Sequence, residues 1–187
     1  MIRSYEDRPL APEVVDRIVA NGLRAPSGGF SQGWGFLVLQ DASDRQRFWD
    51  TAGEQEWLGR NPSMRLAPLL VVALSHKDTY LDRYATAEKG WTDRDEARWP
   101  VPYWDIDTGM AALLMLLTAV DAGLGACFFA ILPERFDAFR TAFAVPAGYS
   151  PVGVVSVGYR SPDTPPQPVD MVTERRPVED VVHHGRW

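Results

Sequence analysis

The segment from Arg24 to Trp34, RAPSGGFSQGW, has the residue types of a loop that approaches another group closely. Gly28 and Gly29 are adjacent in its middle, and a residue without a Cβ lets the backbone lie against a flat neighbour. Pro26 is expected to end the helical pattern that precedes it. The loop is therefore interpreted as a backbone surface on which a flat partner could lie.

Three arginines near the ends of the chain could bind an anion. Arg3, Arg175 and Arg176 each offer a planar guanidinium, whose fork suits phosphate oxygens. Terminal arginines are also common as solvated surface residues. From residue type alone, phosphate binding and simple solvation both stay open.

Other catalytic patterns fail on spacing or context. GLGACF, from Gly123 to Phe128, lacks the third glycine of a dinucleotide loop and follows a helical pattern, so we interpret it as a helix end leading into a strand. His76, His183 and His184 have no acidic or cysteine partner at ligand spacing, so no metal site is predicted. Ser27 lies outside any G-x-S-x-G motif, which argues against a serine hydrolase.

Composition restricts the class of protein. The 187 residues suit a single domain, and the net charge of -6 argues against nucleic acid or an anionic membrane as a partner. The single cysteine excludes a disulfide framework.

The N-terminus has no apolar core of signal-peptide length, and the longest apolar stretch, residues 109–120, is short for a bilayer core of about 30 Å. We expect a cytoplasmic protein. The seven tryptophans suggest a flat ligand, a large interface, or both.

The elements that must position these residues follow from hydrophobic periodicity. It predicts helices at residues 12–25, 43–58, 107–125 and 133–145, with Ser43 as a cap. It predicts strands at 34–40, 67–75, 126–132 and 151–159. Because the third helix is apolar nearly all round, we expect it at the centre of an α+β fold, in which a mixed sheet and helices surround it.

Two segments fit no such pattern. Residues 76–105 combine many charges with six aromatic residues, which favours an ordered flap over disorder. The proline-rich tail, residues 160–187, has little core to join and is expected to cross a surface, such as that of a partner subunit.

Four segments, in order, resemble the FMN-dependent nitroreductase family across the whole chain. Residues 2–39 are similar to its opening helix, A-P-S turn and first strand. DAGLGACFFAIL, residues 121–132, resembles its exit from the central helix into a strand. VGYRSPD and ERRPVEDVV resemble its closing strand and basic element. No one motif is diagnostic, but their common order and spacing make the resemblance specific.

The resemblance implies a nitroreductase-like fold with a mixed, mostly antiparallel sheet around a buried central helix. It also implies a domain-swapped homodimer with two FMN sites at the subunit interface. The chain would form a single domain over residues 1–187, with residues 160–187 as an arm that reaches the partner subunit.

The resemblance further implies cofactor contacts at three places. Arginines would bind the polar edge and phosphate of FMN, the glycine-containing loop of the other subunit would lie against its ring, and a strand end would face flavin N5. The implied cofactor residues are Arg3, Arg175 and Arg176; Ser27, Gly28 and Gly29; and Phe129, Ala130 and Ile131.

On the substrate side this sequence departs from the family's usual residues. Phe30 stands where the family usually has Asn, and Gly33 where it has Pro. An arginine that usually lies three residues before the position of Arg3 is absent. Phe30, with the flap aromatics Trp99, Tyr103 and Trp104, is expected to contact substrate, although those flap residues could equally serve packing or an interface.

The implied reaction passes hydride from NADH or NADPH through FMN to a nitro compound, quinone or activated alkene. A flavin-binding or sequestering protein with little turnover is one alternative. A flavin-consuming, dehalogenating or deazaflavin-using relative is another.

Overall fold

Four antiparallel strands form the sheet of the computed structural model, which describes residues 1–163 and 175–187. Their spatial order is β1-β2-β4-β3. The strands are β1 (Trp34–Leu39), β2 (Leu69–His76), β3 (Gly125–Phe129) and β4 (Tyr149–Gly158). The α+β class and the mostly antiparallel sheet are confirmed. The parallel pair that a mixed sheet would add does not occur between the described strands.

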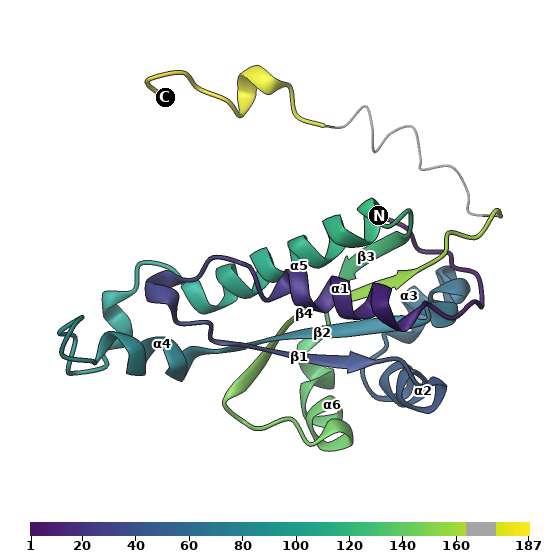
Figure 1. Cartoon of the computed structure of the whole chain (residues 1–187), viewed down its shortest axis with the longest axis horizontal. Coiled ribbons are helices and arrows are strands. Elements are labelled where there is room, and N and C mark those ends of the chain that lie inside the picture. Colours follow the sequence, from purple (N-terminus) through teal and green to yellow (C-terminus); the bar gives the residue numbers. More distant parts are fainter. Residues whose placement is uncertain (164–174) are drawn as a thin grey trace.

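Helices cover both faces of this sheet (Figure 1). One face carries α1 (Pro12–Gly22) and α5 (Tyr103–Asp121), and the other carries α2 (Ala42–Thr51) and α6 (Phe136–Phe143). Alternate residues of β2 therefore enter two separate cores. Leu69 and Val71 pack with the α1 and α5 side, whereas Leu70 and Val72 pack with the α2 and α6 side. Burial on both faces explains the uninterrupted apolar sequence of this strand.

The central helix α5 is buried on one side only. Ala112, Met115 and Ala119 face the sheet and are at most 1% exposed. On its outer side Leu117 is 56% and Val120 is 64% exposed. The expectation of a buried helix therefore holds, in a single chain, for the side of α5 that faces the sheet. The helix is also longer than the apolar stretch seen in the sequence. By length and composition it passes as a membrane span, a test that core helices pass equally.

The predicted helix at residues 43–58 is two helices, α2 and α3 (Gln55–Arg60). Gly53 lies between them, where a Cβ would come within 2.5 Å of a backbone oxygen of α2. Ser43 as a cap was wrong, because α2 begins after Asp41, whose side chain makes no capping bond. Instead Glu54 caps α3, accepting hydrogen bonds from two of its backbone amides.

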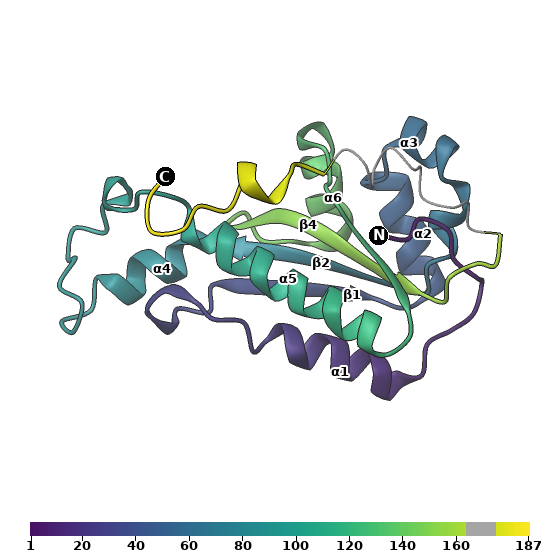
Figure 2. The same cartoon turned by 90° about the horizontal axis from the view of Figure 1, so that it is seen from above.

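The flap is ordered, as expected, and contains α4 (Lys77–Tyr84) and a short turn, η3 (Glu96–Arg98). Both views place α4 at one end of the long axis of the molecule (Figures 1 and 2). Residues 175–187 are all exposed and stand apart from the sheet in Figure 1. Residues 164–174 of the predicted arm lie outside the described residues.

Candidate functional site

The segment Ser27–Gly33, here called the glycine loop, has an unusual backbone. It contains the short helix η1 (Gly28–Phe30). The φ angles of Gly29, Phe30 and Gln32 are +59°, +56° and +53°. This left-handed region suits Gly but strains Phe. Bonds within the loop support the shape, since the Phe30 amide donates to Ser27 O and the Gln32 amide donates to Ser27 Oγ.

Side chains from α4 and α5 hold the loop from outside. The Gly28 amide donates to Asp107 Oδ2 over 2.7 Å, and Arg83 Nε donates to the Gly29 carbonyl over 2.9 Å. A Cβ on Gly29 would lie 2.7 Å from the Tyr84 ring. The close approach predicted for this loop thus occurs within the chain itself. Contact of Ser27, Gly28 and Gly29 with a flavin stays a prediction.

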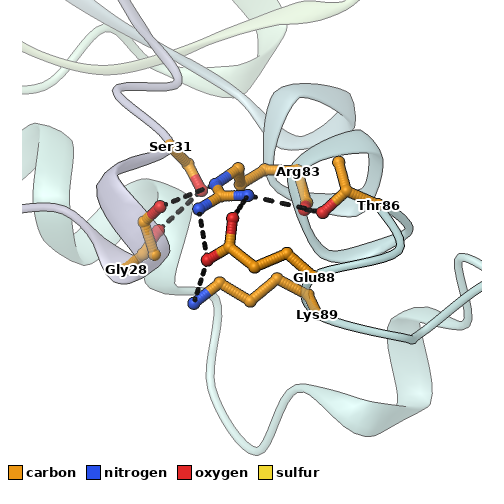
Figure 3. A network of polar contacts seen from close by, with 7 residues as sticks. Gly28, Ser31, Arg83, Thr86, Glu88 and Lys89 are labelled. Atoms are coloured by element: carbon orange, nitrogen blue, oxygen red, sulfur yellow. Dashed lines mark hydrogen bonds and ion pairs between the residues drawn. The ribbon is translucent and has the colours of Figure 1, made fainter.

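Figure 3 shows the polar contacts that surround the loop on the α4 side. Arg83 binds both carboxylate oxygens of Glu88, at 3.0 and 3.1 Å, and also donates to Thr86 Oγ1. The pair with Arg83 lowers the pKa of Glu88. Ser31 Oγ donates to the Gly28 carbonyl over 2.6 Å. One guanidinium therefore connects the loop to the exposed part of the flap.

The aromatic residues of the flap form one cluster beside the loop. Its members are Tyr80, Tyr84, Trp91, Trp99, Tyr103 and Trp104. Trp99 lies in its middle, with ring centroids 4.6–6.0 Å from those of its five neighbours. Trp104 is only 8% exposed, whereas Tyr103 is 37% and Phe30 is 74% exposed. Of the four predicted substrate residues, Phe30 and Tyr103 therefore offer the most open surface in a single chain.

Arg3 lies at a different place, beside the edge strand β3. The Ile2 amide donates to the Ala126 carbonyl over 2.9 Å, which lays the N-terminal residues along this strand. Burial raises the pKa of the Cys127 thiol, and the positive charge of Arg3 nearby opposes this rise. Arg3 itself is exposed. An exposed guanidinium at a strand edge is available to an anion.

The predicted strand end follows directly on the same strand. Phe129 is half-buried and stacks on Trp49, with ring centroids 5.7 Å apart. Ile131 is buried in the core, whereas Ala130 between them is exposed. The structure therefore places Arg3 beside β3 and residues 129–131 at the end of the same strand, which closes at Phe129. Arg3 is not brought to the glycine loop, because the N-terminus is well separated in both views from α4, against which the loop packs (Figures 1 and 2). Phe129 pairs with Val154 within β4, whereas the loop leads into β1 beside His76 at the end of β2.

The two arginines of the tail belong to neither the glycine loop nor the β3 edge in a single chain. Arg175 and Arg176 belong to the exposed segment 175–187. Arg176 donates to the Asp180 carbonyl over 2.8 Å, a bond within that segment. Their predicted contact with the cofactor phosphate remains a prediction.

Sequence reasoning missed Asp107 and Arg83. Asp107 had a visible signal, because it is an acidic residue at the start of an apolar stretch, and it is only 2% exposed. Arg83 had none, since it is one of many charges in the flap.

The sequence of this chain is similar to those of known proteins. A model of the Nitroreductase family matches residues 1–159, which include the glycine loop, the sheet and the β3 edge. A protein of Archaeoglobus fulgidus named "Putative NADH dehydrogenase/NAD(P)H nitroreductase" is 26% identical over 100% of this chain and 92% of its own length.

Solved structures agree in fold. The chain is similar to B. megaterium NfrA1, with a TM-score of 0.76 and 21% identity over 100% of this chain and 70% of that one. It is also similar to an FMN-dependent nitroreductase of Clostridium difficile, with a TM-score of 0.68 and 22% identity over 100% and 94%. Since the family model spans nearly all of the described fold, the chain belongs to the nitroreductase family.

Proposed function

We propose that this protein is an FMN-dependent oxidoreductase that takes hydride from NADH or NADPH and delivers it to an electron-poor small molecule. The observation that carries this proposal is the family match over residues 1–159, the part of the chain that builds both halves of the candidate site. Two relatives support the donor and the cofactor: a Staphylococcus aureus protein is named an NADPH-dependent oxidoreductase, and the C. difficile structure is named FMN-dependent.

The chemical types of the exposed side chains suit FMN. The phosphate needs cationic donors, and Arg3, Arg175 and Arg176 are all exposed. The ring needs a flat surface, which the glycine loop and the Phe30 ring could provide. When bound, FMN would supply the hydride chemistry, so the chain needs no nucleophile of its own. Its residues would bind the cofactor, orient the two substrates and exclude water from between them.

These groups lie apart in one chain, so the proposed site needs two copies. The outer side of α5 offers the surface for this, because Ile106, Leu113, Leu117 and Val120 are all exposed. Residues 113, 117 and 120 have the spacing of one helix face. A contiguous apolar face of this kind is typical of a subunit interface. In the homodimer that we propose, the glycine loop of one subunit would complete the β3 edge of the other, and the arm would reach across the partner.

The acceptor in this proposal is a nitro compound, a quinone or an activated alkene. Phe30 and Tyr103 would lie against it, because Phe30 is an exposed residue of the glycine loop and Tyr103 is exposed within the aromatic cluster. Trp99 and Trp104 would support Tyr103 from within the aromatic cluster.

A visible spectrum of the purified protein tests the proposal. We expect a yellow protein, or one that takes up added FMN, whose absorbance bleaches when NADH or NADPH is added without oxygen. A yellow protein that no nicotinamide bleaches would favour a flavin-binding protein or a relative with another donor. A colourless protein that takes up no FMN would contradict the proposal.

Arg3→Gln adds a residue-level test of cofactor binding. We expect weaker FMN binding by about ten-fold, the loss of one charge-assisted contact. The matched control is Arg60→Gln, which removes another exposed arginine, one paired with Glu56 on α3. Equal FMN affinity in the two variants would contradict the role of Arg3.

A further inference from the structure

A buried carboxylate on α5 has no evident purpose in packing. Asp107 is 2% exposed on a helix whose other buried residues are mainly apolar. Burial of a charged group is unfavourable unless hydrogen bonds compensate for the lost water. Two bonds do so here, both to Oδ2 and both 2.7 Å long, from the Gly28 amide and the Tyr80 hydroxyl. Burial and this carboxylate both raise the pKa of Tyr80, so its hydroxyl stays a donor.

A second side chain, Arg83 on α4, holds the next residue of the glycine loop, Gly29. Arg83 on α4 donates through Nε to the Gly29 carbonyl, while its other nitrogens bind Glu88 and Thr86 (Figure 3). Its side chain is 29% exposed. The Gly28 amide and the Gly29 carbonyl are therefore both engaged by side chains from outside the loop.

The residue that follows shows why such support is needed. Phe30 has a φ of +56° and a side chain that is mostly exposed, so its own packing does not hold it in this strained region. A strained conformation persists only where its surroundings determine it. The bonds on Gly28 and Gly29 fix the two preceding residues and thereby the direction in which the Phe30 ring leaves the backbone.

We propose that Asp107 and Arg83 are positioning residues that set the glycine loop in its binding shape before any ligand arrives. They do so by holding the Gly28 amide and the Gly29 carbonyl. In consequence, the Gly28 amide is not available to a ligand, the Gly29 carbonyl already accepts one hydrogen bond, and the Phe30 side chain leaves the backbone in a fixed direction. The consequence for turnover rests on the proposed function, whereas the effect on the loop does not.

Hydrogen exchange measured by mass spectrometry tests the structural part on the purified protein as isolated. In Asp107→Asn and in Arg83→Gln we expect peptides that contain residues 27–33 to exchange about ten-fold faster, as the loss of one charge-assisted bond predicts. Peptides from β2 and β4 should keep their wild-type exchange. If Asp107→Asn does not fold, Arg83→Gln still tests whether these bonds hold the loop, because the Arg83 side chain is partly exposed.

The chain offers matched controls for both variants. Asp105→Asn removes another carboxylate of α5. Asp105 accepts a hydrogen bond from Ser75 and does not bind the loop. Glu88→Gln removes the ion-pair partner of Arg83 but keeps its bond to Gly29. Both controls should leave exchange of the loop at its wild-type rate. Unchanged exchange in Asp107→Asn and Arg83→Gln, or an equal rise in the controls, would overturn the proposal.

Steady-state kinetics test the functional part. We expect the KM for a quinone acceptor to rise about ten-fold in both variants while kcat stays within about three-fold, since a mispositioned binding loop weakens binding throughout the reaction. Arg83→Lys, which keeps the charge and one donor, should restore part of the loss. Faster loop exchange with unchanged KM would overturn this functional part alone. Absence of FMN binding in the wild type would instead refute the proposed function and leave the exchange result standing.

Discussion

Gly29 and Tyr84 lie so close together that a side chain at position 29 would displace the Tyr84 ring. A Cβ there would lie 2.7 Å from one ring carbon of Tyr84 and 3.1 Å from another. The φ of +59° disfavours a side chain independently of the space. The glycine is thus required by a contact between the loop and α4, two segments that are far apart in the sequence.

Gly29→Ala should therefore destabilise the protein by about 1–3 kcal/mol, from overpacking against the ring together with the positive φ. Urea denaturation followed by tryptophan fluorescence measures this change. Gly59→Ala is the control, because a Cβ at that helical position meets no atom within 4 Å. It should be neutral or stabilise by up to about 1 kcal/mol. Equal stability of the two variants would show that the contact with Tyr84 does not constrain the loop.

Phe30 is the residue whose replacement should separate stability from activity. Phe30→Asn places a residue that tolerates the left-handed region at a φ of +56°. We expect it to unfold at the same or a higher temperature than the wild type, with a gain of up to about 1 kcal/mol. If the exposed ring contacts the acceptor, kcat/KM should fall by about ten-fold, the scale of one lost aromatic contact. Loss of stability without loss of kcat/KM would contradict both expectations.

The strands were predictable because burial leaves a local mark in the sequence. β2 and β4 are apolar without alternation since helices cover both faces, and their positions were correct to within two residues. Gly123, with a φ of +73°, follows the end of α5 and precedes β3, as the interpretation of GLGACF as a helix end suggested. In contrast, α4 is rich in charges and is held by tertiary contacts of Tyr80 and Leu81, so its sequence carries no helical stripe.

The candidate site was predictable only in part, for a related reason. The glycines of the loop are visible in the sequence, but the carboxylate that binds Gly28 lies 79 residues away, and the arginine that binds Gly29 lies 54 residues away. No local periodicity reports such a pairing. The exposure of the outer face of α5 was not predictable either, because an apolar pattern nearly all round a helix predicts burial without saying what covers each side.

Arg175 tests whether the tail reaches the cofactor. Arg175→Ala should weaken FMN binding by about ten-fold or more, since a phosphate would lose a charge-assisted donor. Quenching of FMN fluorescence during titration measures the affinity. Arg186→Ala is the matched control, because it removes another arginine from the same exposed segment. Unchanged affinity in Arg175→Ala would refute the phosphate contact, and equal losses in both variants would indicate a general charge effect.

Tyr5 should make stability depend on alkaline pH. Its hydroxyl is buried against Ser156, and burial raises the pKa of Tyr5 above its ordinary value. The folded state therefore favours the neutral form, and this stabilisation is complete below pH about 10, where the unfolded tyrosine ionises, and is lost as the pH rises further.

Unfolding free energies at pH 8 to 11 would reveal this dependence. Above pH about 10 the wild type should lose up to about 1.4 kcal/mol per pH unit from this one group. Tyr5→Phe should be less stable at pH 8, through loss of the hydrogen bonds, but its stability should fall less steeply with alkaline pH. Parallel curves for the two proteins would contradict the assignment.

The outer face of α5 is the place where a single charge should disrupt assembly. Leu117 is 56% exposed in one chain and lies between two other exposed apolar residues, Leu113 and Val120. If two copies meet here, Leu117→Glu would bury an unpaired carboxylate at the interface, which is strongly unfavourable. We expect sedimentation velocity to show a monomer for this variant, a dimer for the wild type, and a parallel loss of bound FMN. Leu66→Glu, at an exposed leucine outside α5, should remain a dimer with its FMN. A dimeric Leu117→Glu variant would place the interface elsewhere, and a monomer that still holds FMN would show that one chain suffices for the cofactor site.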